Sequence, residues 1–124
     1  MTKGYSVEVL QSYVELTKAE RVRLKTTDNA VRLDEATKNG EVIISPVNWA
    51  ILQVHNEKAN GDKDYQQYII MDKSGATYLT GSENFFNTFM DIFEEMDGED
   101  YQVKAIRMPS KNFKGKDFLS CALV

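Results

Sequence analysis

The segment SENFFNTFMDIFEEMDG, residues 82–98, decides the fold because it has the pattern of one amphipathic helix. Ser82 is a suitable N-cap, and Gly98 can end the helix in a left-handed conformation. Four of the chain's six phenylalanines lie here, so we expect this helix to bury a large part of the core. Its apolar side chains recur every three or four residues and form one stripe: Phe85, Phe86, Phe89, Met90, Phe93 and Met96.

Antiparallel β-strands are predicted on both sides of this helix. Before it, residues 41–45 and 47–55 are separated by Pro46, as at a bulge or an edge. A hairpin follows, in which Asp72-Lys-Ser-Gly75 joins two strands over residues 65–80. After the helix, a second hairpin joins residues 101–108 to 117–124 through a longer basic loop. Residues 47–55 carry apolar side chains in both phases, so we expect this strand to be covered on both faces.

The order of about three strands, one helix and two strands predicts a mainly β protein. It matches a five-stranded OB-type barrel with its helix between strands 3 and 4. A small half-open sheet packed by one helix is the alternative. We expect this domain over residues 30–124, preceded by an N-terminal segment, residues 1–29. In that segment, residues 6–14 fit a strand or a short helix, and Thr17-Lys-Ala-Glu20 predicts a short helix over residues 18–25.

The composition is that of a soluble protein in a reducing compartment. A chain of 124 residues with 27% charged residues fits one globular domain. No apolar run approaches the ~20 residues that a membrane helix requires. The single cysteine, Cys121, cannot form an internal disulfide. We therefore expect a cytoplasmic protein without membrane association.

Charge is distributed unevenly along the chain. Residues 1–100 hold 10 Lys and Arg against 18 Asp and Glu, whereas residues 101–124 hold five against one. No acid occurs between Tyr101 and Lys116. This asymmetry indicates a local anion-binding surface on the second hairpin, although an ordinary solvated basic hairpin is the alternative.

The sequence offers little for catalysis. His55 is the only histidine, and Cys121 has no basic neighbour to activate it. Motifs for phosphate loops, nucleophile elbows and zinc proteases are lacking. We therefore predict no enzymatic activity, no cofactor and no metal site. The acids after the helix fit a solvated turn better than a cation site: Glu94, Glu95, Asp97, Glu99 and Asp100.

Binding of single-stranded nucleic acid suits the sequence better, because it requires cations for phosphates and aromatic faces for unstacked bases. The second hairpin interleaves Phe113 with lysines, and further aromatic residues lie on the predicted strands. Trp49 and Tyr68 have a core role as their alternative. The candidate nucleic-acid-binding residues are Trp49, Tyr68, Tyr78, Lys104, Arg107, Lys111, Phe113, Lys114 and Lys116.

Residues 31–124 resemble the single-stranded DNA-binding proteins of small protein-primed tailed phages. The resemblance rests on the order of NGEVII (39–44), IIMD (69–72), YQVKA (101–105) and SKNFKGKDF (110–118). It implies an OB-like fold that coats displaced single strands during phage replication, in the cytoplasm of a bacterial host. It also implies binding by tyrosines and basic residues, here Tyr68, Tyr78, Lys104, Lys111 and Lys114. About 30 N-terminal residues have no counterpart in it.

We therefore predict a non-enzymatic, largely sequence-independent single-stranded DNA-binding protein of phage or prophage origin. Replication proteins are candidate partners. A homo-oligomer is compatible with the sequence. A phage-encoded module that acts on a host or replication protein through its acidic surface and N-terminal segment is the first alternative. A binder of structured RNA is the second.

Overall fold

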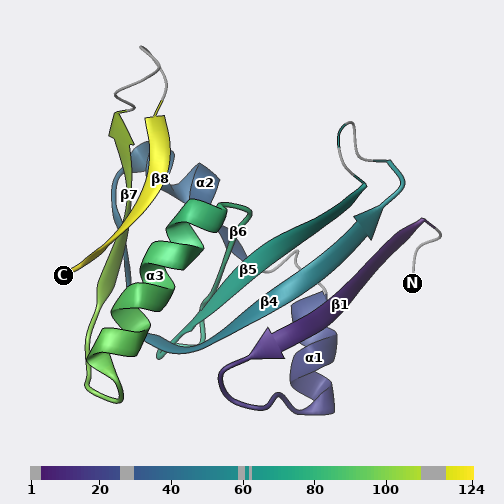
Figure 1. The fold of residues 1–124 in the computed structure, drawn as a ribbon, viewed down its shortest axis with the longest axis horizontal. Coiled ribbons are helices and arrows are strands. Elements are labelled where there is room, and N and C mark those ends of the chain that lie inside the picture. The colour runs from purple at the N-terminus through teal and green to yellow at the C-terminus, as the bar shows by residue number, and fades with distance from the viewer. Residues whose placement is uncertain (1–3, 26–29, 59–60, 62, 110–116) are drawn as a thin grey trace.

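Two β-sheets and three α-helices make up the described chain (Figure 1). The computed structural model describes residues 4–25, 30–58, 61, 63–109 and 117–124. The large sheet has the order β1 (Tyr5–Ser12), β4 (Pro46–Asn56), β5 (Asp64–Asp72), β6 (Thr77–Thr80) and β2 (Val31–Arg32). The small sheet has the order β3 (Val42–Ile44), β7 (Val103–Pro109) and β8 (Asp117–Leu123). The helices are α1 (Lys18–Lys25), α2 (Leu33–Ala36) with the following 3-10 turn η2 (Thr37–Asn39), and α3 (Glu83–Met96).

The helix α3 forms as the sequence predicts. The Ser82 hydroxyl accepts a hydrogen bond from the Phe85 N–H at 3.1 Å, and the helix ends at Asp97 and Gly98, which have φ angles of 27° and 84°. Phe85 and Phe89 are fully buried. Figure 1 shows α3 between β8 and the strands β4 and β5, so its aromatic stripe fills the space between the two sheets.

The chain passes from one sheet to the other at Pro46. Only Ser45 separates β3 in the small sheet from β4 in the large one. Proline has no N–H for the ladder, and the pairing of β4 with β5 shifts register between Pro46 and Asn48. The predicted interruption at this proline is therefore confirmed.

The described strands form two sheets rather than one closed barrel. Closure would require β6, or β2 beyond it, to pair with β8, and the described residues contain no such pairing. The free edge of β6 is taken instead by β2, which pairs in parallel with Val31 opposite Tyr78 and Arg32 opposite Leu79. The expectation of mainly β structure is confirmed, but a closed five-stranded barrel is not what these strands form.

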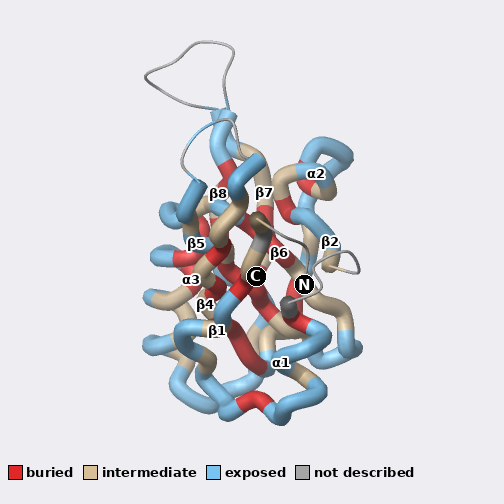
Figure 2. Tube along the Cα trace, turned by 90° about the vertical axis from the view of Figure 1, so that its right-hand side faces the viewer, coloured by how far each residue is buried: buried red, intermediate tan, exposed pale blue. Residues whose placement is uncertain are grey.

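Both faces of the large sheet are covered. One face packs with α3 and the small sheet through Trp49, Tyr68 and Ile70. The other face packs with the N-terminal segment through Ala50, Leu52 and other apolar side chains. Figure 2 shows the buried segments running through the middle of the molecule. The alternation of apolar residues in both phases of residues 47–55 correctly predicted a strand that is covered on both sides.

The N-terminal segment is part of the large sheet. Its β1 pairs antiparallel with β4 over Tyr5–Ser12, so the strand alternative for residues 6–14 is correct. The predicted capping box starts α1: the Thr17 N–H donates to Glu20 Oε1 at 2.9 Å, and the Glu20 N–H donates to Thr17 Oγ1 at 3.2 Å. Leu24 of α1 is buried in the same core as Ala50 and Leu52. Residues 5–24 thus share a core with the domain predicted over 30–124.

Candidate nucleic-acid interface

The small sheet has one buried face and one exposed face. Val103 and Ala105 of β7 and Leu119 and Cys121 of β8 point into the core. Because side chains alternate along a strand, the intervening residues point the other way. We call this surface the outer face of the small sheet, and it consists of Ile43, Lys104, Ile106, Met108, Phe118, Ser120 and Ala122.

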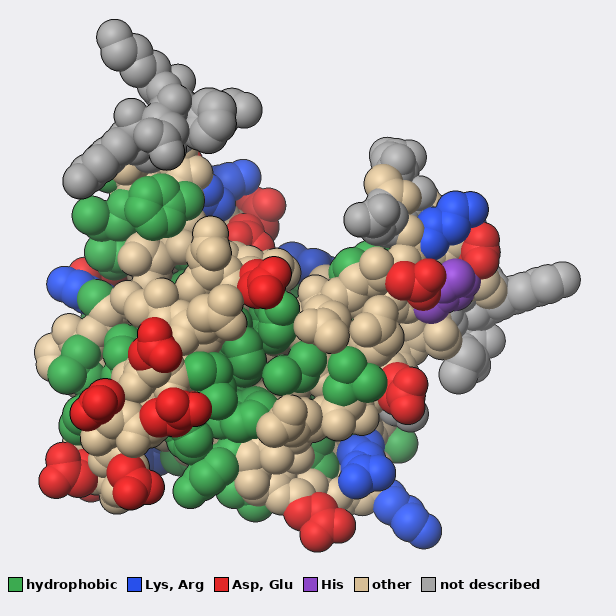
Figure 3. Space-filling view, in the orientation of Figure 1, with side chains coloured by type: hydrophobic (Ala, Val, Ile, Leu, Met, Phe, Trp, Pro, Cys, Tyr) green, Lys and Arg blue, Asp and Glu red, His purple; other side chains and the backbone are tan. Residues whose placement is uncertain are grey.

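The outer face exposes large apolar side chains next to one another. Phe118 is 47% exposed and Met108 41% exposed, and the two residues are direct partners across β7 and β8. Ile43, 40% exposed, lies in the same row as Lys104 and Ala122. Figure 3 shows hydrophobic side chains at the tip of the small sheet. A broad ring beside apolar neighbours is the kind of surface on which an unstacked base can lie.

Lys104 supplies the charge of the outer face. It is the only charged residue on this face among the described strands of the small sheet. No ion pair within 4 Å involves Lys104 in the described part of the chain. Its ammonium group is therefore available to a phosphate. Lys104 lies four residues along β7 from Met108, the partner of Phe118, so the charge and the ring are roughly 13 Å apart on the same face.

Arg107 forms contacts within the chain. It lies in the inward phase of β7, with its side chain 23% exposed, and its Nη1 is 3.2 Å from Asp117 Oδ1. Its Nη2 also donates to the backbone carbonyl of Asp34 in α2. The guanidinium group thus joins α2 to the β7–β8 hairpin.

Trp49 and Tyr68 are core residues in this structure. Trp49 is 4% exposed, with its ring edge-to-face with Phe86 and Phe93 at centroid distances of 5.9 and 6.1 Å. Tyr68 is 7% exposed and stacks on Phe86 at 4.4 Å. Because both rings are already packed on α3, neither offers a face to a base. The expectation that they are open for stacking is therefore corrected.

The remaining candidate nucleic-acid-binding residues do not all lie on the outer face. Tyr78 of β6 is half-buried and packs against the core below α3, away from the outer face. Lys111, Phe113, Lys114 and Lys116 lie outside the described residues, in the segment that connects β7 to β8. Among the described candidates, only Lys104 lies on the outer face.

The sequence analysis missed Phe118, Met108 and Ile43 as candidate binding residues. The signal was present for Phe118, because it precedes Leu119 and Cys121 in an alternating strand. Once those two residues are assigned to the core, Phe118 must point outward. The sequence does not say which phase is buried, however, since Phe118 and Leu119 are both strongly apolar.

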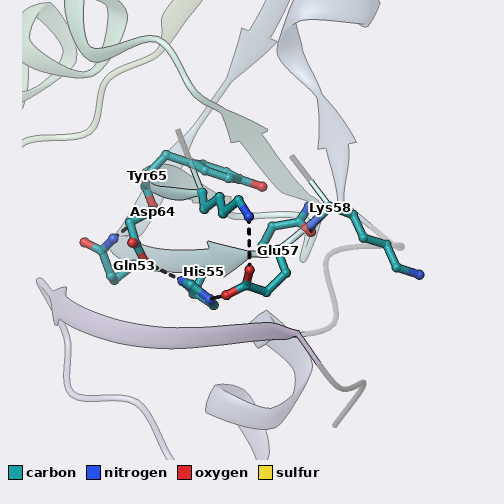
Figure 4. A network of polar contacts seen from close by, with 8 residues as sticks. Gln53, His55, Glu57, Lys58, Asp64 and Tyr65 are labelled. Carbon is teal, nitrogen blue, oxygen red and sulfur yellow. Dashed lines mark hydrogen bonds and ion pairs between the residues drawn. The ribbon is translucent and has the colours of Figure 1, made fainter. Parts of the chain in front are cut away.

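A network of polar contacts holds the far end of the β4–β5 hairpin (Figure 4). His55 Nδ1 is 2.7 Å from Asp64 Oδ1, and His55 Nε2 is 2.6 Å from Glu57 Oε1. Lys63 Nζ donates to Glu57 Oε2 at 3.2 Å, and the Glu57 N–H donates to the carbonyl of Gly4 at 2.7 Å. The imidazole thus joins β4 to β5, and the loop is tied to the start of β1.

The His55 contacts predict a pH dependence of stability. Hydrogen bonds to Asp64 and then to Glu57 raise the pKa of His55 above its usual 6.5. The stabilisation is fully present below that usual value and is lost as pH rises through the raised one. Hydrogen bonds from His55 and then Lys63 lower the pKa of Glu57 below 4.5, so its contribution is lost only in acid. We expect the difference in melting temperature between the wild type and His55→Gln to shrink as pH rises from weakly acidic to alkaline. A difference independent of pH would contradict this assignment.

The Cys121 thiol and the Tyr101 hydroxyl are both shielded from water and stay protonated at neutral pH. Burial raises the pKa of the Cys121 thiol to about 12, so the nucleophilic thiolate is not populated. Burial also raises the pKa of Tyr101 to about 12. In the described residues, no group of three His, Cys, Asp or Glu side chains is placed to hold a metal ion. None of the described helices has the length and apolar character to cross a membrane.

Comparison of this chain with protein-family models, with curated proteins and with solved structures finds no match.

Proposed function

We propose that this protein is a non-enzymatic, largely sequence-independent single-stranded DNA-binding protein of phage or prophage origin. It protects single strands during DNA replication. Phosphates are neutralised by Lys104 and by the lysines of the β7–β8 connection, while bases stack on Phe118. The outer face of the small sheet carries this proposal, because it presents an exposed ring with an apolar neighbour and, two residue pairs farther along the sheet, a cation that forms no ion pair among the described residues.

The proposal includes an OB-type architecture that is open at one side. The order of elements supports it: β3 and β4 act as one bent strand shared by both sheets, followed by β5, β6, α3, β7 and β8. OB-folds bind oligonucleotides partly through the loops between strands 1 and 2 and between strands 4 and 5. The corresponding segments here follow β4 and β7, and the second of them holds Lys111, Lys114 and Lys116.

The acidic side of the molecule favours a second candidate function. From Ser74 to Val103 the chain has no Lys or Arg, and α3 carries Glu83, Asp91, Glu94 and Glu95 on or beside its exposed side. This surface repels DNA. It suits a phage-encoded module that binds a basic region of a host or replication protein. In that case the protein would fold normally but would not bind oligonucleotides.

A titration with oligo(dT) tests the proposed function. We expect the anisotropy of a labelled strand to rise and saturate, with an affinity that falls steeply with salt. We also expect the emission of Trp49 to change little, because its ring is buried beside Phe86 and Phe93. Strong quenching of Trp49 would place the strand near the core face of α3 instead. Absence of binding at low salt would refute the DNA-binding proposal and favour the protein-interaction module.

Competition experiments define the class of nucleic acid. We expect unlabelled oligo(dA) and oligo(dC) to compete with oligo(dT), because stacking and phosphate contacts tolerate any base. Duplex DNA should compete weakly. Structured RNA that competes better than single-stranded DNA would instead support an RNA-binding function.

A further inference from the structure

Helix α1 is strongly cationic although it lies in the acidic part of the sequence. Its eight residues, KAERVRLK, hold four Lys and Arg against one Glu. Lys18, Arg21 and Arg23 are exposed, and none of them forms an ion pair within 4 Å in the described chain. The carboxylate of Glu20 accepts a hydrogen bond from the Thr17 N–H, so it is held at the helix start.

The helix presents two different sides. Lys18 and Arg21 are three residues apart and therefore lie on the same side of α1. Leu24 faces the large sheet and is buried. Arg23 lies at a cavity of about 480 Å³ between α1 and the sheet. The lining of this cavity is mainly apolar and includes Val47, Ile69 and Met71, and Glu20 of α1 also lines it.

The charges on the two faces of the large sheet are opposite. The helix α3 packs on one face and carries four acids without a cation, whereas α1 packs on the other face. Figure 3 shows Lys and Arg side chains, with an acidic side chain next to them, at the α1 end of the molecule, and Asp and Glu side chains over α3 and the turn after it. Such a polarised molecule turns its cationic side toward a polyanion during association.

We propose that α1 is a second contact surface for the phosphate backbone of a bound single strand. This inference rests on the proposed function and extends it to the N-terminal segment. Lys18 and Arg21 contact phosphates, and the apolar cavity beside Arg23 receives an unstacked base or its sugar. The strand therefore contacts both the outer face of the small sheet and the α1 side of the large sheet.

The double variant Lys18→Ala/Arg21→Ala tests this surface. Each phosphate contact on single strands contributes a slope of ~0.7 in the dependence of log affinity on log salt. We expect the double variant to bind oligo(dT) more weakly, with a slope smaller by ~1.4. The control is Lys38→Ala/Lys63→Ala, which removes the same charge from lysines that already pair with Glu35 and Glu57. Lys18→Arg/Arg21→Lys should keep the wild-type slope.

The outcomes separate this inference from the proposed function. If the wild type binds and the α1 variant has the slope of the wild type, α1 is not in contact with the strand and the inference is wrong. If both double variants lose the same amount, only net charge matters, and the inference is also wrong. If the wild type itself does not bind, the proposed function fails first. Circular dichroism of each variant confirms that α1 is retained, since Ala favours the helix.

Discussion

Phe89→Ala is expected to lower the free energy of unfolding by about 3–5 kcal/mol. Phe89 is 0% exposed and lies in the middle of α3. It contacts the rings of Phe86 and Phe93, at centroid distances of 5.9 and 6.2 Å. Truncation to Ala removes the apolar area and leaves a cavity between the two sheets. Because stabilities of small domains are about 5–15 kcal/mol, much of the total is lost.

Urea denaturation followed by circular dichroism measures this loss. Asn87→Ala is the matched control, because Asn87 is exposed on the same helix and its replacement should change stability by less than about 0.5 kcal/mol. A variant Phe89→Ala with near-wild-type stability would show that α3 does not hold the two sheets together. Unfolding of the full-length protein and its variants is measured at equal protein concentration, so that any self-association affects all of them equally.

Local signals predicted the elements of this fold well. The helix α3 could be placed by its aromatic period and by the caps Ser82 and Gly98. The start of α1 followed from the capping box of Thr17 and Glu20, and the first hairpin from Gly75, which has a φ of 94°. Each of these signals acts within a few residues, so the sequence carries it directly.

Long-range pairing could not be predicted in the same way. Nothing local in the weakly alternating β1 indicates that it pairs with β4, because the partners, which range from Ser12 and Ala50 to Tyr5 and Asn56, are far apart in the sequence. The parallel pairing of β2 with β6, which occupies the edge needed for barrel closure, involves only two residues. Such strand pairings depend on which sheet edges have no partner strand once the other strands have paired, and a short stretch of sequence does not carry that information.

The exposure of single side chains in the candidate site could not be predicted from the sequence either. The strand β4 has apolar residues in both phases, so the sequence could not decide whether Trp49 lay in the core or on the surface. The structure buries Trp49 under α3 and exposes Phe118 on β8. The sequence predicted that aromatic residues would be needed for stacking. Which aromatic ring is exposed depends on which side of each strand faces the core, and the sequence did not determine that.

Phe118→Ala is expected to weaken binding to oligo(dT) by about 1–3 kcal/mol, roughly 5- to 150-fold. Phe118 is 47% exposed, so its ring can stack on a base without moving the core. The salt dependence should stay that of the wild type, because the substitution removes no charge. Lys104→Ala, by contrast, should lower that slope. The two variants thus separate the stacking contribution from the electrostatic one on the same face.

The matched control for this experiment is Tyr13→Ala. Tyr13 is 56% exposed and contacts Phe93 of α3 at a centroid distance of 4.6 Å, on the acidic side of the molecule. It therefore removes an exposed ring of similar size from a surface that repels phosphates. If Tyr13→Ala weakens binding and Phe118→Ala does not, the strand lies across the α3 side and the outer face of the small sheet is not the interface. If only Phe118→Ala weakens binding, the exposed ring on the face that carries Lys104 acts as a stacking platform. The DNA path then begins on β8, where the core residues Leu119 and Cys121 hold Phe118 in its outward position.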